Sequence, residues 1–358
     1  MLINDTTYAF NLRGEIIKKL VDKGFEVVIV GQLLKHQDKL KAIGAKLIGV
    51  ETDRRGTNPF SDLHLMYTYK KILSGEKPDV VLTFNIKPNV YGGIACRLLK
   101  IPYIPNVTGL GTAVENGGLM QKITLTLYKI GLCNAQKVFF QNAENRDFML
   151  QHGLVKGAYE VLPGSGVNLD LHCFEQYPQD DGELRFLFVG RIMRDKGIAE
   201  FLDCAGYIKG KYPNMQFDVI GELDEEKYHT WVEELHGKGV IHFYGRRSDV
   251  HEFMKTHHAL ILPSYHEGMS NVLLEAAATG RPVIATDVPG CRETYDDEIS
   301  GIGFESKSSE ALIHAVERFI ELPYEKKQQM GIAGRKKVEA EFDRKKVIAA
   351  YLDAMKVL

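Results

Sequence analysis

One pattern repeats along most of the chain: a short apolar run rich in β-branched residues, followed by a longer segment with helical periodicity. Alternating strands and helices favour parallel sheets, because each crossover returns the chain to the same edge and leaves helices on both faces. The predicted fold class is therefore α/β, with doubly wound parallel sheets. The runs read as strands are 25–31, 45–50, 78–85, 137–142, 184–190, 217–222, 240–245, 258–264 and 281–287.

The strands form two series, separated by residues 159–185, which carry glycine, proline and acidic residues and show little helical periodicity. Such a stretch is typical of an inter-domain linker, and 358 residues are enough for two domains. We predict a Rossmann-like domain over 1–164 and a second over 165–342, facing each other across a cleft. The C-terminal helix, within 343–358, is expected to cross back and pack on the first domain.

Composition excludes several classes of protein. A hydrophobic fraction of 44% and a charged fraction of 26% are those of an ordinary globular protein. The net charge of -2 lacks the positive field of a nucleic-acid binder. The first 20 residues do not resemble a signal peptide, and no run approaches the roughly 18 apolar residues of a membrane span. We expect a cytoplasmic protein, with attachment to the membrane surface left open.

Cysteine and histidine spacing gives no metal signature. The five cysteines are odd in number, widely spaced and without a C-x-x-C pair, which argues against a zinc site and against disulfides. We read them as small buried hydrophobes, with a reactive thiol as the alternative. No H-x-x-x-H pair lies on a predicted helix, and His257 and His258, at the start of a strand, are expected to be structural. We therefore predict neither a metal nor a cofactor. The cysteines are Cys96, Cys133, Cys173, Cys204 and Cys291.

A glycine and two cations follow the strand at 184–190. Gly190 and Arg191 come first, Lys196 follows five residues after Arg191, and a helix begins next. Free N–H groups and the macrodipole at a helix N-terminus favour an anion there, and an arginine can bind phosphate oxygens with both arms of its fork. The alternative is a solvated, charge-rich turn. The spacing of a P-loop is absent.

The stretch "SYHEGMSNVLLEAAATG", residues 264–280, combines a loop and a short helix with two carboxylates. Ser270 and Asn271 are candidate capping residues of the helix. Glu275 lies one turn further, on the same side as Asn271, where a carboxylate can accept hydrogen bonds from the two hydroxyls of a ribose. Glu267, in the loop, is expected to face the cleft. In the alternative interpretation Glu267 caps the helix and Glu275 is simply exposed.

These segments together resemble a known family. The E-x7-E pair after a strand, the following "AAATGRPVIATDVPGCRE", the preceding "VGRIMRDKG" and the linker "VLPGSGVNLDLHCF" are similar to retaining glycosyltransferases of family 4, which have the GT-B fold. The resemblance covers essentially the whole chain, in the family's order. It implies that Arg191 and Lys196 bind the donor diphosphate and stabilise the departing nucleotide. Glu267 would contact the sugar at the reacting centre, and Glu275 would bind the ribose.

The resemblance also implies further contacts on both substrates. On the donor side Arg246 would recognise the base. Members of the family generally work without a metal, and protein cations would take the metal's role. The sequence around 104–155 is similar to the branch that builds capsular, O-antigen or glycan-carrier polysaccharides. The other donor contacts are Gly190, His266, Gly268, Met269, Ser270 and Asn271, and the acceptor candidates in the first domain are Asn4, Asn85, Thr108 and Gly109.

That branch implies a substrate pair. A hexose such as N-acetylgalactosamine or N-acetylglucosamine would move from a UDP-sugar to a polyprenyl-diphosphate-linked saccharide at the inner membrane face, with retained anomeric configuration. The segment 117–132 mixes apolar residues with Lys122 and Lys129, as a helix lying on a membrane surface does. Its alternative is to pack on its own domain.

Two departures and three rival functions accompany the resemblance. Only Met1–Ile3 precede Asn4, so either the first strand is very short or the start is truncated, and 300–312 differs from the family's usual sequence. A nucleotide-sugar epimerase or a phosphorylase could use the same fold, as could a catalytically silent nucleotide-sugar-binding scaffold. A dinucleotide dehydrogenase is disfavoured, because no G-x-G-x-x-G follows an early strand.

Overall fold

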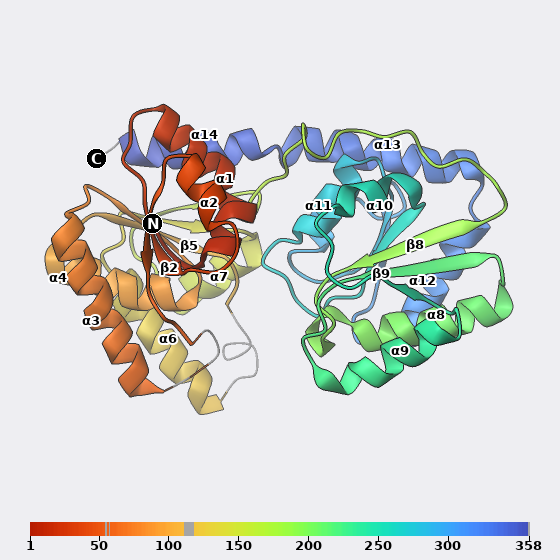
Figure 1. The fold of residues 1–358 in the computed structure, drawn as a ribbon, viewed down its shortest axis with the longest axis horizontal. Coiled ribbons are helices and arrows are strands. Elements are labelled where there is room, and N and C mark those ends of the chain that lie inside the picture. The colour runs from red at the N-terminus through yellow and green to blue at the C-terminus, as the bar shows by residue number, and fades with distance from the viewer. Residues whose placement is uncertain (54–55, 57, 111–117, 357–358) are drawn as a thin grey trace. The chain divides into compact units, whose positions relative to one another are not determined.

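The computed structural model describes residues 1–53, 56, 58–110 and 118–356. The chain forms two compact units: unit 1 comprises Met1–Ser165 with Lys345–Leu358, and unit 2 comprises Gly166–Arg344. Each unit is built on one sheet whose paired strands are all parallel, with helices on both of its faces (Figure 1). The predicted fold class is confirmed.

The sheet of unit 1 has the order β3-β2-β1-β4-β5-β6-β7. The order reverses between β1 and β4, so the carboxyl ends of these two strands form a topological switch point, the usual ligand position of such sheets. The strands are β1 (Leu2–Asp5), β2 (Val28–Gln32), β3 (Lys46–Gly49), β4 (Val81–Phe84), β5 (Tyr103–Val107), β6 (Lys137–Phe140) and β7 (Ala158–Val161).

Helices cover both faces of this sheet (Figure 1). The side chain of Asp5 caps the first of them by accepting from the amide of Tyr8 at 2.8 Å. One face carries α1 (Thr6–Asp22), α2 (Gln37–Ala42) and α14 (Arg344–Lys356); the other carries α3 (Pro59–Glu76), the π-helix η1 (Pro88–Gly92), α4 (Gly93–Leu99) and α6 (Gly118–Leu132), and α7 (Ala143–Gln151) links β6 and β7.

Helix α14 contributes to the core of unit 1. Tyr351 is fully buried, with its ring 4.8 Å from that of Phe139 and 6.0 Å from that of Phe84. Its hydroxyl accepts a hydrogen bond from the side-chain amide of Asn106. The C-terminal segment is therefore joined to β4, β5 and β6 by apolar packing and by a buried polar contact.

Unit 2 is built on the sheet order β10-β9-β8-β11-β12-β13, with its switch point between β8 and β11. Strands β11 and β12 are buried at every residue, as expected where helices cover both faces. The elements are β8 (Leu184–Val189), η2 (Arg194–Lys196), α8 (Ile198–Lys211), β9 (Met215–Ile220), η3 (Glu226–Tyr228), α9 (His229–Gly237), β10 (His242–Phe243), α10 (Val250–Thr256), β11 (Ala259–Leu262), α11 (Asn271–Ala278), β12 (Val283–Thr286), η4 (Arg292–Thr294), β13 (Gly301–Phe304), α12 (Ser309–Glu321) and α13 (Tyr324–Glu341).

The structure corrects the predicted linker over 159–185. Its first residues belong to β7, and from Gly166 onward it is part of unit 2. Tyr177 is buried there and donates a hydrogen bond to the carbonyl of His258 at 3.0 Å. The segment lacks helical periodicity because it packs as an extended chain, and lack of periodicity alone does not make a linker.

The cysteine and histidine predictions are partly correct. Cys96, Cys204 and Cys291 are buried as expected, but Cys133 is only half-buried and Cys173 is exposed, so these two are not core hydrophobes. The histidines at the start of β11 are structural. His257 Nε2 lies 3.0 Å from Asp218 Oδ2, and His258 Nδ1 accepts from the amide of Arg185 at 3.1 Å.

Replacement of Tyr351 should destabilise unit 1 specifically. Tyr351→Ala removes a fully buried aromatic ring, and such truncations cost about 3–5 kcal/mol. Tyr67→Ala, at an exposed tyrosine of α3, should change stability by no more than about 0.5 kcal/mol. Hydrogen exchange of β4 and β5 amides in the full chain, under mild denaturant, measures the difference. Equal protection in the two variants would contradict this role of α14.

Candidate functional site

The loops that follow β8 and β11 carry most of the predicted donor residues. These strands pair in parallel, with Ala259 opposite Phe186 and Leu260 opposite Leu187. Their carboxyl ends therefore lie at one edge of the sheet, on either side of the switch point of unit 2. Arg191 and Lys196 are on the first loop, and residues 264–270 form the second.

A glycine brings these two loops into contact. Gly197 is the N-cap of α8 and has a φ of 69°, a left-handed conformation that favours glycine. A Cβ at this position would lie only 2.0 Å from the carbonyl oxygen of Pro263. The amide of Tyr265 then donates to the carbonyl of Asp195 at 3.0 Å. Backbone contacts therefore hold the residue next to Gly197, Lys196, beside the end of β11.

Lys196 and Glu267 form an ion pair in this arrangement. The Lys196 ammonium donates to Glu267 Oε1, and the Ser264 hydroxyl donates to the same oxygen at 2.9 Å. The side chains of Lys196 and Glu267 are 21% and 15% exposed, so both charges are largely withdrawn from water. The structure thus brings together two of the three predicted catalytic residues, and pairs them with each other.

The two predicted arginines are held by acids of the loop after β9. Arg191 Nη1 lies 3.0 Å from Asp224 Oδ2, and Arg246 Nη1 lies 3.2 Å from Glu222 Oε2. Their side chains are about half exposed, at 50% and 43%. Guanidinium groups that are solvated on one side can exchange a carboxylate for a phosphate, because both anions present paired oxygens to the fork. Gly190 lies close to Gly221, because a Cβ added to Gly221 would lie 1.8 Å from the Gly190 carbonyl oxygen.

The N-terminus of α11 differs from the prediction in its capping. Ser270 occupies the N-cap position, but its side chain makes no capping hydrogen bond, so the predicted cap is wrong. Its amide instead donates to the carbonyl of Gly290 at 2.7 Å, which positions the backbone for the helix. Asn271 is the first helical residue, and its Oδ1 is buried without a hydrogen-bond partner among the described residues. An uncapped helix start presents N–H groups and partial positive charge to an anion.

Glu275 lies one turn into α11 and is partly buried. Its side chain is 25% exposed, so it is not the exposed carboxylate of the alternative interpretation. Burial raises the pKa of Glu275 to about 7, against an opposing effect of the Arg344 charge. His172 Nε2 lies 3.9 Å away. Burial lowers the pKa of His172 to about 4, and the nearby His251 and Arg344 act in the same direction. At neutral pH this histidine is uncharged, so it provides Glu275 with no counter-charge.

The remaining donor candidates lie in the loop before α11. His266 and Gly268 are half-buried. The side chain of Met269 is buried and packs in a cluster that includes Leu274 and Val338. The side chain therefore belongs to the core, and only the backbone of Met269 forms part of the loop. Their predicted contacts with sugar and phosphate stay predictions.

The acceptor candidates lie at the corresponding edge of the sheet in unit 1. Asn4 is in β1 and Asn85 follows β4, so they flank that unit's switch point, and the Asn4 amide contacts Asn85 Oδ1 at 3.4 Å. Asn85 has a φ of 75°, an uncommon conformation that turns the chain into the next segment. Thr108 and Gly109, both half-buried, follow the neighbouring strand β5. All four residues therefore lie at the ends of adjacent strands.

Sequence reasoning did not identify the partners of these groups. Ser264, which donates to Glu267, opens the stretch 264–280 but was given no role of its own. His172, beside Glu275, lies in the segment taken for a linker. Neither has a sequence signal of its own, because both reach their partners through the tertiary fold. The predicted absence of a metal in the donor site also stays a prediction.

Comparisons with known proteins agree with this arrangement. Residues 1–142 match the family model "Glycosyl transferase 4-like", and residues 173–337 match "Glycosyl transferases group 1". One relative is the N,N'-diacetylbacillosaminyl-diphospho-undecaprenol alpha-1,3-N-acetylgalactosaminyltransferase of Campylobacter jejuni, 29% identical over 87% of this chain and 86% of the relative. Another is the UDP-Gal:alpha-D-GlcNAc-diphosphoundecaprenol alpha-1,3-galactosyltransferase of Escherichia coli, 25% identical over 75% and 73%.

A solved structure shows the same fold. The Anabaena HepE protein in complex with UDP-glucose is similar with a TM-score of 0.79 and 15% identity, over 100% of this chain and 99% of that one. The two family models follow one another along the chain and together extend through both units. The predicted family and the predicted enzyme class, a hexosyltransferase, are confirmed: the chain belongs to the glycosyltransferases, with a glycosyl transferase 4-like N-terminal half and a group 1 C-terminal half.

Proposed function

We propose that this glycosyltransferase moves a hexose or N-acetylhexosamine from a UDP-sugar to a polyprenyl-diphosphate-linked saccharide during surface polysaccharide or glycan assembly, with retained anomeric configuration. The observation that carries the proposal is the combination at the switch point of unit 2. It consists of the largely buried Lys196–Glu267 ion pair, the uncapped start of α11, and Glu275 one turn further along that helix. A nucleoside diphosphate sugar presents an anion and a ribose, and the cation with the helix start suits the first, while the Glu275 carboxylate suits the second.

The two relatives support the choice of substrates. The printed name of the Campylobacter jejuni protein describes transfer of N-acetylgalactosamine to an undecaprenol-diphosphate-linked sugar. That of the Escherichia coli protein describes transfer of galactose from UDP-galactose to a similar acceptor. Both acceptors are lipid-linked diphosphate sugars, and both transferred groups are hexoses. We infer the same classes of donor and acceptor for this chain.

The ion pair suggests how the site handles charge during transfer. When the bond between the anomeric carbon and the diphosphate oxygen breaks, negative charge grows on the diphosphate and positive charge on the sugar ring. Lys196 would exchange Glu267 for the diphosphate, and with the α11 N-terminus would stabilise the leaving group by preorganised electrostatics. Glu267 would then be freed from Lys196 and face the sugar, while it still accepts from the Ser264 hydroxyl. The acceptor hydroxyl attacks the same face, and its proton passes to an oxygen of the departing phosphate.

Donor and acceptor specificity tests the proposal. The full-length protein is incubated with a panel of UDP- and GDP-sugars and a short polyprenyl-diphosphate saccharide, and products are followed by chromatography and NMR. We expect transfer from a UDP-hexose or UDP-N-acetylhexosamine, with the anomeric configuration of the donor in the product. Interconversion of free UDP-sugars would indicate the epimerase, and binding without turnover the silent scaffold. An inverted product would contradict the retaining mechanism.

Removal of the Lys196 cation should reduce catalysis strongly. Lys196→Ala removes stabilisation that grows in the transition state, for which losses of about 10²–10³ in kcat are typical. Arg194→Ala is the matched control, because Arg194 is an exposed cation in the same short helix, η2, and has no assigned role. Initial rates of transfer at saturating donor measure both variants. A decrease below tenfold for Lys196→Ala, or equal decreases for both variants, would contradict the role of Lys196.

The environment of Glu275 makes UDP binding depend on pH. If the ionised carboxylate accepts hydrogen bonds from the ribose, affinity is highest above the pKa of about 7 and is lost as the pH falls through it. Between pH 8 and pH 6 we expect affinity to fall by about tenfold, as the ionised fraction does. Calorimetric titration with UDP measures this.

The Glu275→Gln variant separates this effect from the titration of UDP itself. It should bind UDP more weakly at pH 8 and show a shallower pH dependence. Glu310→Gln, at an exposed glutamate of α12, should behave as the unmodified protein. Identical pH profiles for Glu275→Gln and the unmodified protein would refute the ribose assignment.

One face of unit 1 has the composition of a membrane-contacting surface. Helix α3 exposes Phe60, Leu63 and Tyr67, which recur at helical spacing on one side. Helix α6, on the same face of the sheet (Figure 1), exposes Met120 and Ile123. The opposite side of α6 buries Tyr128 and Leu132, so this helix packs on its own unit and still presents apolar residues outward.

We infer that this face lies on the membrane surface, where a lipid-linked acceptor is found. Lys122 and Lys129 are exposed on α6 and would favour anionic lipids. Within the described ranges, the helices are all too short or too polar to cross a bilayer. Contact with the membrane would therefore be peripheral, by partial insertion of apolar side chains.

Charge introduced on this face should weaken membrane binding. Ile123→Glu replaces an apolar residue, 46% exposed, with an anion, and should lower partitioning to vesicles containing anionic lipid by about tenfold or more. Ile332→Glu on α13 of unit 2 is the matched control, since Ile332 is 38% exposed and lies outside the proposed surface. Vesicle sedimentation measures both variants, and equal partitioning would exclude this face as the contact.

A further inference from the structure

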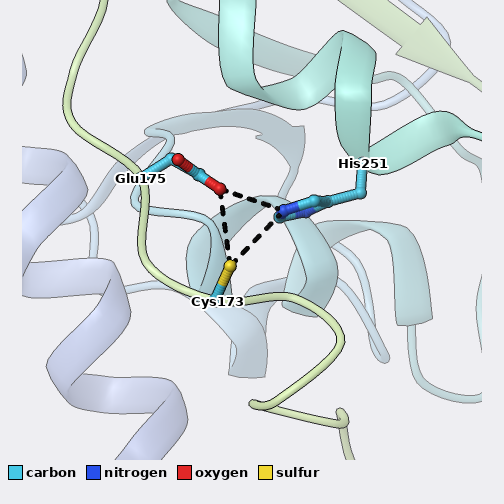
Figure 2. A group of neighbouring side chains, drawn as sticks. All are labelled: Cys173, Glu175 and His251. Carbon is cyan, nitrogen blue, oxygen red and sulfur yellow. Dashed lines mark hydrogen bonds and ion pairs between the residues drawn. The ribbon is translucent and has the colours of Figure 1, made fainter.

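Three potential metal ligands converge in unit 2 outside the donor residues assigned above. Cys173 and Glu175 lie in the extended segment before β8, and His251 is on α10. Figure 2 shows their side chains pointing toward one another. Cys173 Sγ is 3.4 Å from Glu175 Oε1 and 3.7 Å from His251 Nε2, and His251 Nε2 is 3.4 Å from the same glutamate oxygen.

These separations match the edges of a tetrahedral zinc site. With Zn–S of about 2.3 Å and Zn–N and Zn–O of about 2.0–2.1 Å, tetrahedral angles place sulfur about 3.6 Å from the other ligand atoms, and N and O about 3.4 Å apart. The observed triangle of 3.4, 3.7 and 3.4 Å differs little from this. A thiolate, an imidazole and a carboxylate are also the ligand types that zinc prefers.

The imidazole of His251 is oriented as a ligand requires. The hydroxyl of Thr279 donates to the carbonyl of Glu275 at 2.8 Å, so its oxygen is free to accept from His251 Nδ1, 3.3 Å away. With the proton on Nδ1, the lone pair of Nε2 is directed at Cys173 and Glu175. Metal-binding histidines usually donate their second N–H to such an outer partner.

The backbone that carries the other two ligands is also held in place. The amide of Glu175 donates to the carbonyl of Thr279 at 3.1 Å. The ring of Phe174 packs against Gly280, where an added Cβ would lie 2.6 Å from a ring carbon. The Glu175 carboxylate is therefore positioned before any ion binds.

One neighbouring charge opposes a cation. Lys255 Nζ lies 3.5 Å from Glu175 Oε1, and 3.0 Å from Glu252 Oε1. The simpler interpretation is that the cluster is a surface ion pair between Glu175 and Lys255 with a thiol beside it. That interpretation explains Lys255 but not the position of Cys173 or the outer partner of His251. Lys255 can retain Glu252 when it leaves Glu175.

We propose that Cys173, Glu175 and His251 form a zinc-class divalent cation site, with a water at the fourth position on the exposed side of Cys173. Binding converts the Cys173 thiol to a thiolate and releases its proton to solvent, so that the ion replaces the hydrogen bond that the thiol donates to Glu175. The ion would join the segment before β8 to α10 and, through Thr279, to the end of α11. It takes no part in sugar transfer.

Cobalt(II) is a suitable probe, because a cobalt–thiolate bond has a charge-transfer absorption band and tetrahedral cobalt has intense visible bands. The full-length protein is reduced, freed of metal with a chelator and titrated with cobalt(II) and then with zinc. We expect one equivalent of cobalt to produce both features and zinc to displace it. We also expect zinc to raise the thermal unfolding temperature of the protein, because it binds the native state.

Variants assign the ligands. Cys173→Ser should abolish the charge-transfer band, and His251→Gln should weaken binding by at least about tenfold, since loss of even an outer partner costs about 10–100-fold. Cys133→Ser and His314→Gln are matched controls, at a half-buried cysteine and at an exposed histidine beside glutamates, and should bind as the unmodified protein does. No cobalt spectrum, or a spectrum unchanged in Cys173→Ser, would overturn the proposal.

Lys255→Gln distinguishes a cation site from an ion pair. Removing this positive charge frees Glu175 and should tighten zinc binding, whereas a purely structural ion pair would only be weakened. Unchanged or weaker zinc affinity in Lys255→Gln would contradict an ion placed beside Glu175 Oε1. Sugar-transfer activity should persist in Cys173→Ser, which separates this site from the proposed function.

Discussion

The close approach of Gly197 to the carbonyl of Pro263 is the contact on which the donor-side geometry depends. It brings the loop after β8 against the loop after β11, and only glycine is tolerated there, because an added Cβ would lie 2.0 Å from the Pro263 carbonyl oxygen. Lys196 precedes this glycine and Glu267 follows the proline by four residues, so the backbone contact sets their ion pair. The end of β12 and the loop after it support the same region, since Thr286 donates to the Ser264 carbonyl and Gly290 accepts from the Ser270 amide.

The two glutamates of residues 264–280 occupy different electrostatic environments, although eight positions separate them. Glu267 has a lysine and a hydroxyl as partners, which offset the cost of withdrawing its charge from water. Glu275 has a neutral histidine beside it, and burial outweighs the Arg344 charge and raises the pKa of Glu275 to about 7. The first carboxylate is therefore fixed and paired, while the second is sensitive to protonation and open to a neutral hydroxyl donor. The environment of Glu267 suits contact with the sugar, and that of Glu275 suits contact with the ribose.

Polar groups around α11 connect the proposed sites of unit 2. Thr279, at the C-cap of this helix, donates to the Glu275 carbonyl and lies next to His251, and the His172 ring is 5.6 Å from that of His251. The segment containing His172, Cys173 and Glu175 is thus part of the surroundings of the helix. An ion bound at Cys173 would stabilise the frame around Glu275 without contacting it.

Much of the fold was predictable because its signals are local. Strands such as β11 and β12 are continuous apolar runs, whereas β13 contains two glycines and was missed. One of these, Gly301, is required because a Cβ would lie 2.6 Å from the Val283 carbonyl. β7 was also missed, since its residues are exposed or half-buried.

The sequence by itself determined the α/β class, the order of the elements and the position of the site residues directly after strands, because periodicity and turn residues act over a few positions. Only the tertiary structure decided which side chains meet. Lys196 and Glu267 are 71 residues apart, Cys173 and His251 78, and Asn106 and Tyr351 245. Such pairs depend on strand order and on close backbone contacts, and no local pattern records them.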